Sequence, residues 1–315
     1  MKRLFLLIPA VLMLDGCALL QAVARRDKAG IVSEGKKVGQ TVGEAVGDIK
    51  DASKELSPEN EYYVGRAVSA NLLAKYDFKY LEPAGPAGAT ADYVASVGYV
   101  LAAAAEGLRD GTMRAAPVGG WNFVVLDAEV INAFGAPGGF VFVTRGALLA
   151  AKNEEEIAAM LAHEIAHVMQ GHGLGSIKTE RFGKVAGKWF KKGAQALTPT
   201  QMDAMTESLD GSVADVSDTL IGNGYSRSSE GQADALGQRI AAAAGYDPRA
   251  MISLLGSIKG QQATSQGGML ATHPSNADRV KKLEANAKKL GAVKAEPIRT
   301  ERYAKAVAPI LQAPR

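Results

Sequence analysis

The segment 163–167 reads H-E-I-A-H, and these residue types at this spacing can do metal chemistry. On a helix, His163 and His167 are one turn apart and project from one face, where two neutral imidazoles can bind one Zn²⁺. Glu164 points toward the neighbouring edge of that face, where it can take a proton from an attacking water. A pattern with only three fixed residues also arises by chance, so it needs support from other parts of the chain.

A catalytic zinc site needs a third protein ligand, and Glu230 is the strongest candidate. It lies at the start of a predicted helix that Ser226 can cap, and Asp234 follows one turn later on the same face. A ligating carboxylate with a second carboxylate beside it fits a ligand and a residue that orients a zinc-bound histidine. The alternative is a solvated acidic pair on a helix surface. His172, between two glycines, is interpreted as a partner of the dipole at the end of the first helix.

The helix that carries the two histidines is predicted to begin after Asn153. Asn153 can cap it, Glu156 has the spacing of a capping-box partner, and acidic residues fill the first turn. Apolar residues recur along one stripe, so we expect a core helix.

The elements before it are predicted to be two helices and two strands. The helices are expected from Pro58 to about 76 and over about 91–108, and the strands over 121–126 and 140–143 with a glycine-rich turn at 135–139. From 153 onward the pattern is helical almost throughout. The fold class is therefore α+β, with a small sheet between helices.

Composition bears on the size of the core, on nucleic-acid binding and on disulfide bonds. With 315 residues, 47% of them hydrophobic, the chain can bury a sizeable core in one catalytic domain with an N-terminal arm. A formal net charge of only +3 gives no sign of a nucleic-acid partner. The single cysteine, Cys17, excludes an intrachain disulfide.

Residues 1–16 are interpreted as a lipoprotein signal peptide. A basic start precedes the apolar stretch 4–14, which is too short to span a bilayer, and the segment L-D-G-C at 14–17 resembles a bacterial lipobox. The resemblance implies a lipid on Cys17, and Ala18 after it implies sorting to the outer membrane. The alternative is an ordinary cleaved signal peptide with an incidental cysteine. No other segment is apolar enough for a transmembrane helix.

Three further segments permit only broad interpretations. Residues 17–56 form a charged arm in which glycine recurs every fourth residue, either as a helix that packs closely or as a flexible tether. The basic segment 178–192 is a solvated surface helix, a lid or a membrane-binding patch. The prolines in 291–315 predict a loosely packed C-terminal tail.

Four segments resemble the HtpX-like and CAAX-prenyl-protease-like family of gluzincins, in particular its periplasmic lipoprotein members. They are residues 132–139, 163–167, 230–234, and Thr272-His273-Pro274 with Arg279. The resemblance runs from about 58 to 290 in the family's order and spacing. It implies a helix-rich, zincin-like metalloprotease domain over 57–290 with one zinc ion.

The resemblance also implies roles for single residues. His163, His167 and Glu230 are the expected zinc ligands, and Glu164 is the expected general base. Arg279, which matches the family's pattern, is expected beside Asp234 behind the ligands.

The segment Asn132-Ala133-Phe134 corresponds to the family's edge strand, which pairs with the substrate backbone. An unpaired strand edge binds an extended peptide through main-chain hydrogen bonds, largely regardless of sequence. The alternative is a simple hairpin corner.

His273 has three possible roles. Folded back to the metal, it could donate a hydrogen bond to the oxyanion of the reacting peptide. It could instead be a fourth zinc ligand that keeps the enzyme latent. The third possibility is a loop histidine that caps the helix after Pro274.

Together these features predict a zinc-dependent endopeptidase of the bacterial periplasm, held to the membrane by its lipid. The resemblance implies that its substrates are unfolded or misassembled envelope proteins. The rival hypothesis is a chaperone-like or scaffolding module with a closed zinc site and little proteolysis.

Overall fold

The computed structural model describes residues 56–75, 78–82, 84–85, 87–177, 210–259, 268–273, 277–291, 293 and 296–311. The predicted signal peptide, the predicted lipidation site Cys17, the arm up to residue 55 and the basic segment 178–192 lie outside these residues. The following paragraphs concern the described residues alone.

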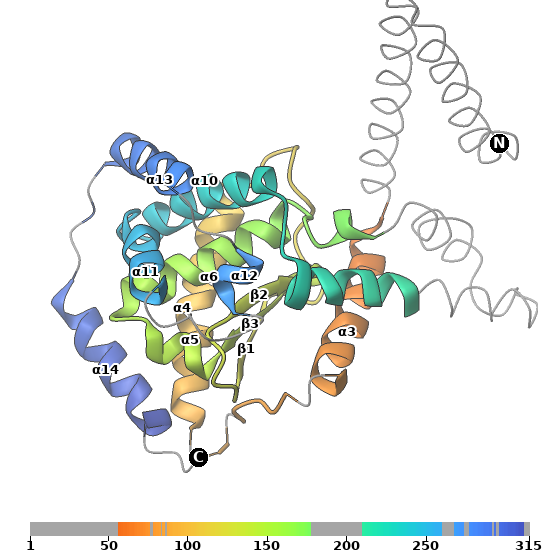
Figure 1. Cartoon of the computed structure of the whole chain (residues 1–315), viewed down its shortest axis with the longest axis horizontal. Helices are drawn as coiled ribbons and strands as arrows, with labels where there is room; N and C mark the ends of the chain where they lie inside the picture. Colours follow the sequence, from red (N-terminus) through yellow and green to blue (C-terminus); the bar gives the residue numbers. More distant parts are fainter. Residues whose placement is uncertain are drawn as a thin grey trace, which may run out of the picture. The chain divides into compact units, whose positions relative to one another are not determined.

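Helices precede and follow a small sheet (Figure 1). In chain order the elements are α3 (Pro58–Lys75), α4 (Gly88–Gly107), β1 (Asn122–Leu126), β2 (Ala133–Ala136), the 3₁₀-helix η1 (Pro137–Gly139), β3 (Phe140–Thr144), α5 (Arg145–Ala150), α6 (Glu154–Met169), the 3₁₀-helix η2 (Leu174–Ser176), the π-helix η4 (Thr219–Asn223), α10 (Arg227–Ala243), α11 (Ala250–Lys259), α12 (Met269–Thr272), α13 (Ala277–Leu290) and α14 (Pro297–Leu311). The predicted α+β class is confirmed.

The sheet has the strand order β1-β3-β2. β1 runs parallel to β3, whereas β2 and β3 are antiparallel, with Phe134 opposite Phe142. β2 is therefore an edge strand, as the sequence predicted. At the other edge, Tyr80 forms a bridge with Leu126 of β1.

α6 is the central helix of the domain. All sixteen of its residues are buried, and it packs against α4, α10, α11 and β2 (Figure 1). Asn153 caps it as predicted, because its side chain accepts a hydrogen bond from the backbone N–H of Glu156 at 3.0 Å. The Glu156 carboxylate accepts from the N–H of Lys152 instead of Asn153, so the capping box is displaced by one residue.

The C-terminal segment differs from the predicted tail. Residues Pro297–Leu311 form α14, whose buried residues Tyr303, Val307 and Ile310 belong to the hydrophobic core. Pro297 is compatible with this helix because it stands at the first position, where no hydrogen bond from the nitrogen is needed. Pro309 lies inside the helix, where it removes one backbone hydrogen bond only in the last turn. The prediction of a loosely packed tail was wrong for this helix.

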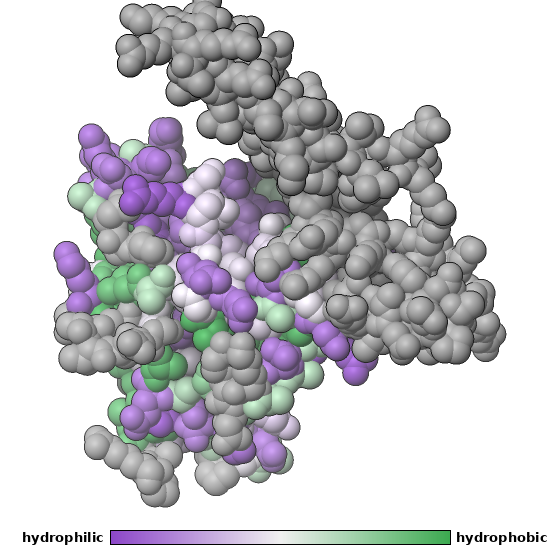
Figure 2. All heavy atoms as spheres, turned by 45° about the vertical axis from the view of Figure 1, so that its right-hand side comes forward, coloured by the Kyte–Doolittle hydropathy of each residue, from purple (hydrophilic) through white to green (hydrophobic). Residues whose placement is uncertain are grey.

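The coloured part of the surface in Figure 2 carries hydrophilic and hydrophobic residues in small intermingled groups. Among the described residues, no helix has the length and apolar character that a membrane span requires.

Candidate metal centre

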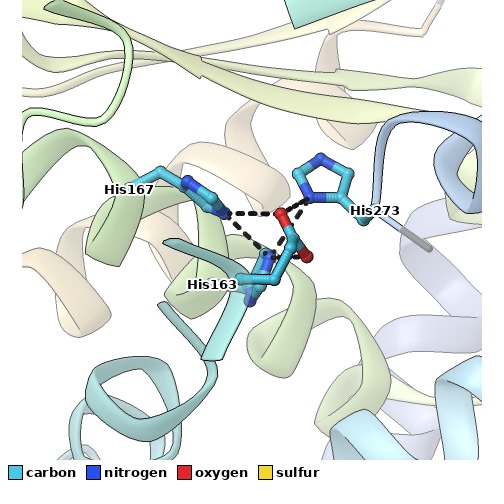
Figure 3. A group of neighbouring side chains, drawn as sticks. His163, His167 and His273 are labelled. Atoms are coloured by element: carbon cyan, nitrogen blue, oxygen red, sulfur yellow. Dashed lines mark hydrogen bonds and ion pairs between the residues drawn. The ribbon is translucent and has the colours of Figure 1, made fainter. Parts of the chain in front are cut away.

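Four donor side chains converge beside α6. His163 and His167 lie on α6, and Glu230 lies in the first turn of α10. His273 is the C-cap residue of α12. All four are buried, and one ligand atom from each lies within 4.8 Å of the others. Figure 3 shows the three histidine rings turned toward one another and joined by dashed lines to a carboxylate. The structure thus brings together residues that are up to 110 positions apart in the sequence.

The spacing of the donor atoms fits a small tetrahedral cation. Ligand atoms about 2.0–2.1 Å from a tetrahedral zinc lie about 3.3–3.4 Å from one another. The two Nε2 atoms of His163 and His167 are 3.1 Å apart, and His163 Nε2 lies 3.3 Å from His273 Nδ1. Glu230 Oε1 lies 3.3 Å from His167 Nε2 and 2.9 Å from His273 Nδ1. The donor set of nitrogen and carboxylate oxygen also suits zinc.

The electrostatics of the cluster favour a positive charge at its centre. Burial alone would lower the pKa of His163, but hydrogen bonds to Asp234 and Glu230 raise it to about 10. Burial would raise the pKa of Glu230, yet the neighbouring histidines hold it far below its ordinary value. The pKa of His167 is well below its ordinary value, mainly because of burial, so its imidazole is neutral as a metal ligand must be. A cation would satisfy both the carboxylate and the facing ring nitrogens.

Glu164 lies next to this cluster and is completely buried. Its Oε1 is 3.6 Å from Nε2 of His273. Burial raises its pKa, which the charge of His273 and the backbone N–H of Gly135 partly oppose. A carboxyl group with a raised pKa suits a proton acceptor that must later release the proton.

Asp234 and Arg279, the two residues expected behind the ligands, lie beside His163. Asp234 Oδ1 lies 3.1 Å from His163 Nδ1, and Arg279 donates two hydrogen bonds of 2.8 Å to the same carboxylate. Burial raises the pKa of Asp234, but His163 and Arg279 lower it below the ordinary value. Arg279 also lies 3.0 Å from Glu230 Oε2 and donates to the backbone oxygen of His273. One guanidinium therefore braces both sides of the cluster.

Tyr225, His172 and Gln232 were not assigned to the site from the sequence. Tyr225 stacks on the His167 ring, with centroids 4.2 Å apart and planes 18° apart. His172 lies behind His167 and contacts Gln232, so the interpretation of His172 as a partner of the helix dipole misses its main contact. The signal that could have found His172 is Gly171, whose positive φ turns the chain back over the end of α6.

The predicted substrate strand contributes little through its side chains. Ala133 and Phe134 are buried, and Phe134 stacks on Phe142 in the core with centroids 5.0 Å apart. The Asn132 side chain accepts a hydrogen bond from the N–H of Ala133, which fixes the start of β2. Only the backbone of this strand could contact a peptide.

The strand lies unusually close to α6 because of a glycine. A Cβ atom at Gly135 would lie 2.7 Å from the backbone oxygen of Glu164. Any larger side chain there would push β2 away from Glu164.

The turn that carries His273 is held against the start of β2. The N–H of Met269 in α12 donates to the backbone oxygen of Ile131 at 2.7 Å. Gly224, with φ +67°, permits a close approach, because a Cβ there would lie 2.2 Å from the Thr272 oxygen. His273 is therefore fixed by backbone packing as well as by its ring.

An open cavity lies beside the cluster between α10 and α13. Glu230, Asp234 and Arg279 line its inner part, and Arg227 and Lys282 line it near the surface. The cavity thus reaches the buried candidate third ligand from this side.

The profile of peptidase family M48 matches residues 96–287 of this chain. The match contains α6 and α10 and ends within α13, so α14 lies beyond it.

Curated proteins with related sequences carry the names of metallopeptidases. The chain is 28% identical over 208 residues to a putative beta-barrel assembly-enhancing protease of Vibrio cholerae, which covers 65% of this chain and 41% of the relative. It is 31% identical over 157 residues to the beta-barrel assembly-enhancing protease of Yersinia pestis, and 29% identical over 170 residues to the human mitochondrial metalloendopeptidase OMA1. Each of these two matches covers about half of this chain, 49% and 52%, but only 32% of the relative.

Proposed function

This chain belongs to peptidase family M48 and is a metalloprotease, and we propose that it is a zinc-dependent endopeptidase of the bacterial cell envelope. The chain spans less than half the length of the curated relatives named above, so the substrates and partners of those longer proteins are not simply transferred. The proposal is built from the site.

The observation that carries the proposal is the convergence of His163, His167 and Glu230 with Glu164 beside them. These three residues would hold the ion, and the tetrahedral spacing of their donor atoms supports zinc. A bound zinc ion would activate a water and polarise the carbonyl of the scissile peptide. Glu164 takes the proton of the attacking water and returns it to the leaving amine. Its burial and raised pKa support both transfers.

The shape of the site supports an extended polypeptide as the substrate. β2 is an edge strand beside the helix that carries Glu164, so its backbone can pair with an extended chain regardless of the chain's sequence. Unfolded or misassembled proteins offer such segments, whereas folded proteins do not. The names of the bacterial relatives support envelope proteins as the substrate class.

The N-terminal residues support the proposed location. A lipid on Cys17 would anchor the protein in the periplasm, in the outer membrane if Ala18 directs sorting. The test is labelling of the expressed protein with a radioactive or alkyne-tagged fatty acid. Label in the parent and none in Cys17→Ser supports the anchor, and equal label in both contradicts it.

His273 supports a latent resting state. Its Nδ1 lies within the donor cluster, where it would complete four protein ligands and leave no open position. The same arrangement supports the rival hypothesis of a closed, chaperone-like module, because a four-ligand site has the character of structural zinc. The two hypotheses differ in whether any condition produces cleavage that depends on Glu164.

The first experiment is cleavage of casein by the zinc-loaded soluble protein, from residue 18 onward, beside Glu164→Gln. Cutting by the parent and none by the variant supports the endopeptidase. No cutting by either protein, with one zinc per chain, supports the latent or chaperone-like alternative.

The second experiment replaces His273. If His273 blocks the fourth position, His273→Ala raises casein cleavage and leaves zinc bound. If it donates to the oxyanion, His273→Ala lowers kcat by about 10²–10³-fold. Unchanged cleavage would contradict both roles.

A further inference from the structure

The side of the His167 ring that faces away from the donor cluster has a partner of its own. His167 Nδ1 lies 2.9 Å from Nδ1 of His172, and Nε2 of His172 lies 3.1 Å from Oε1 of Gln232. The catalytic steps described above do not use these contacts. They link the end of α6 to α10, the helix that supplies Glu230.

The end of α6 places His172 there by local geometry. After Met169, Gly171 takes φ +67°, its N–H donates to the oxygen of Val168, and the N–H of His172 donates to the oxygen of His167 at 3.1 Å. These two bonds define a Schellman motif, in which the second residue past the helix cap packs on the residue whose carbonyl it bonds. That contact is usually apolar, and here it joins two imidazoles.

The direction of each proton in this chain of contacts follows from the donor cluster. Nε2 of His167 faces the other donor atoms, so it must offer a lone pair to a metal. The neutral ring therefore carries its proton on Nδ1 and donates it to Nδ1 of His172. His172 then carries its own proton on Nε2 and donates it to the amide oxygen of Gln232. Each N–H donor in this series of hydrogen bonds has an acceptor, and all the bonds run in one direction, from His167 to Gln232.

We propose that His172, itself held by Gln232, is a positioning residue that fixes the tautomer and orientation of His167 for metal binding. The inference rests on the proposed function, since it assumes that His167 is a ligand. Tyr225 fixes the plane of the same ring by stacking, and His172 fixes its rotation within that plane. Outer partners of this kind raise metal affinity because the ligand does not have to be ordered when the metal binds.

The other histidine ligand has a different support. Asp234 and Arg279 hold His163 through a buried ion pair, whereas His172 and Gln232 hold His167 through neutral groups. Neutral support adds no further charge to a site that already contains the carboxylates of Glu164, Glu230 and Asp234.

The test compares His172→Leu with His172→Asn. The two side chains have the same branched shape, but only asparagine places an acceptor, Oδ1, where Nδ1 of histidine stands. Zinc affinity is measured by competition with a chromophoric chelator. We expect His172→Leu to bind zinc about 10–100-fold more weakly than the parent, whereas His172→Asn keeps an affinity much closer to the parent's.

A purely structural role is separated by the metal-free proteins. If His172 only packs against the end of α6, the metal-free Leu variant, measured in EDTA, melts at a lower temperature than the metal-free parent. Its zinc affinity then falls no more than that of the Asn variant. Equal affinities in both variants, whether lowered or unchanged, would overturn the proposal. A weaker Leu variant with an unchanged metal-free melting temperature supports it.

Gln232→Leu provides a second variant that is safe for folding, since Gln232 is exposed. It removes the outer acceptor and leaves His172 in place, so we expect a smaller loss of zinc affinity in the same direction. An unchanged affinity would show that Gln232 does not hold His172. None of these readouts needs cleavage. If neither the parent nor His273→Ala cuts casein although both bind zinc, the proposed endopeptidase fails while the role of His172 is still decided.

Discussion

The two ends of α6 contain similar numbers of buried acidic and polar groups. They differ in how fully these groups are hydrogen-bonded within the protein. At the N-terminal end, Glu154 is buried and accepts hydrogen bonds from Tyr93 at 3.1 Å, Tyr246 at 3.0 Å and the Nε of Arg302 at 2.7 Å. Glu155 accepts from Arg299, and Glu156 from Ser253. Each carboxylate there is matched by donors from α4, α11, α14 or the loop after α10.

At the C-terminal end the buried groups of α6 are only partly compensated within the protein. Two imidazole Nε2 atoms face each other at 3.1 Å, and the pKa of Glu164 is raised because it is buried. The comparison teaches that one helix serves two purposes. In its first turn, polar groups are satisfied within the protein, whereas its last turns hold groups whose proposed partners are a cation and a substrate.

The largest expected effect is on catalysis at the C-terminal end. Glu164→Gln should lower kcat for casein by about 10²–10⁴-fold, because the amide cannot accept the proton of water. Zinc content and the urea midpoint should not fall, since the variant buries no charge. A urea midpoint that fell together with kcat would mean that Glu164 is structural and would remove the contrast between the two ends.

The largest expected effect on stability is at the N-terminal end. Glu154→Ala should lower the free energy of unfolding by about 3 kcal/mol, because the hydroxyls of Tyr93 and Tyr246 lose their acceptor. Arg302→Ala should cost less, about 1 kcal/mol, since that side chain is 50% exposed and water replaces its partner. Urea unfolding measures both losses of stability. Equal losses would contradict the prediction that the hydrogen bonds from the two tyrosines contribute more than the ion pair with Arg302.

Zinc binding should slow hydrogen exchange mainly at the C-terminal end of α6. At a free concentration of 100 times its Kd, zinc stabilises the fold by about 2.7 kcal/mol. Hydrogen exchange through local opening should slow most at the amides of 163–169 and least at those of 154–158. Removal of zinc with a chelator should reverse the effect. Uniform protection along α6 would mean that the two ends open as one unit.

The smallest effect concerns alkaline pH at the N-terminal end. The Tyr303 hydroxyl lies 2.7 Å from the backbone oxygens of Leu148 and Ala151, and burial raises its pKa from 10.0 to about 12. Between these values the unfolded chain loses this proton while the folded chain keeps it, so stability falls as pH rises from 10 to about 12. Tyr303→Phe should flatten that part of the urea-midpoint profile. An identical slope in parent and variant would assign the alkaline loss to other groups.

Local patterns predicted much of the framework. The cap at Asn153, the strands near 122 and 140 and the helix that Ser226 caps follow from hydrogen bonding and periodicity within a few residues. The edge position of β2 was expected from the family resemblance instead. The i, i+4 spacing of His163 and His167 predicted their shared face for the same reason. Their role as ligands stays a prediction, as does that of Glu230.

Where the sequence interpretation failed, the missing information was a distant partner. The glutamates 154–156 have the composition of an ordinary first turn, and nothing near Glu154 reveals that its partner is Arg302, 148 residues later. The same gap made α14 look like a tail. His172 illustrates a halfway case, since Gly171 determines its position locally whereas Gln232 on another helix gives it a second contact.

The sequence by itself determined the helix that carries the motif, its cap, the spacing of two donors and the resemblance to a metallopeptidase family. Only the tertiary structure decided that Glu230 and His273 bring donor atoms within 4.8 Å of those donors, and that a C-terminal helix packs against the opposite end of α6. The physical reason is the range of the interactions. Caps, turns and periodic faces are determined by neighbours along the chain, whereas a buried cluster of charges forms only when packing of the whole core brings its members together.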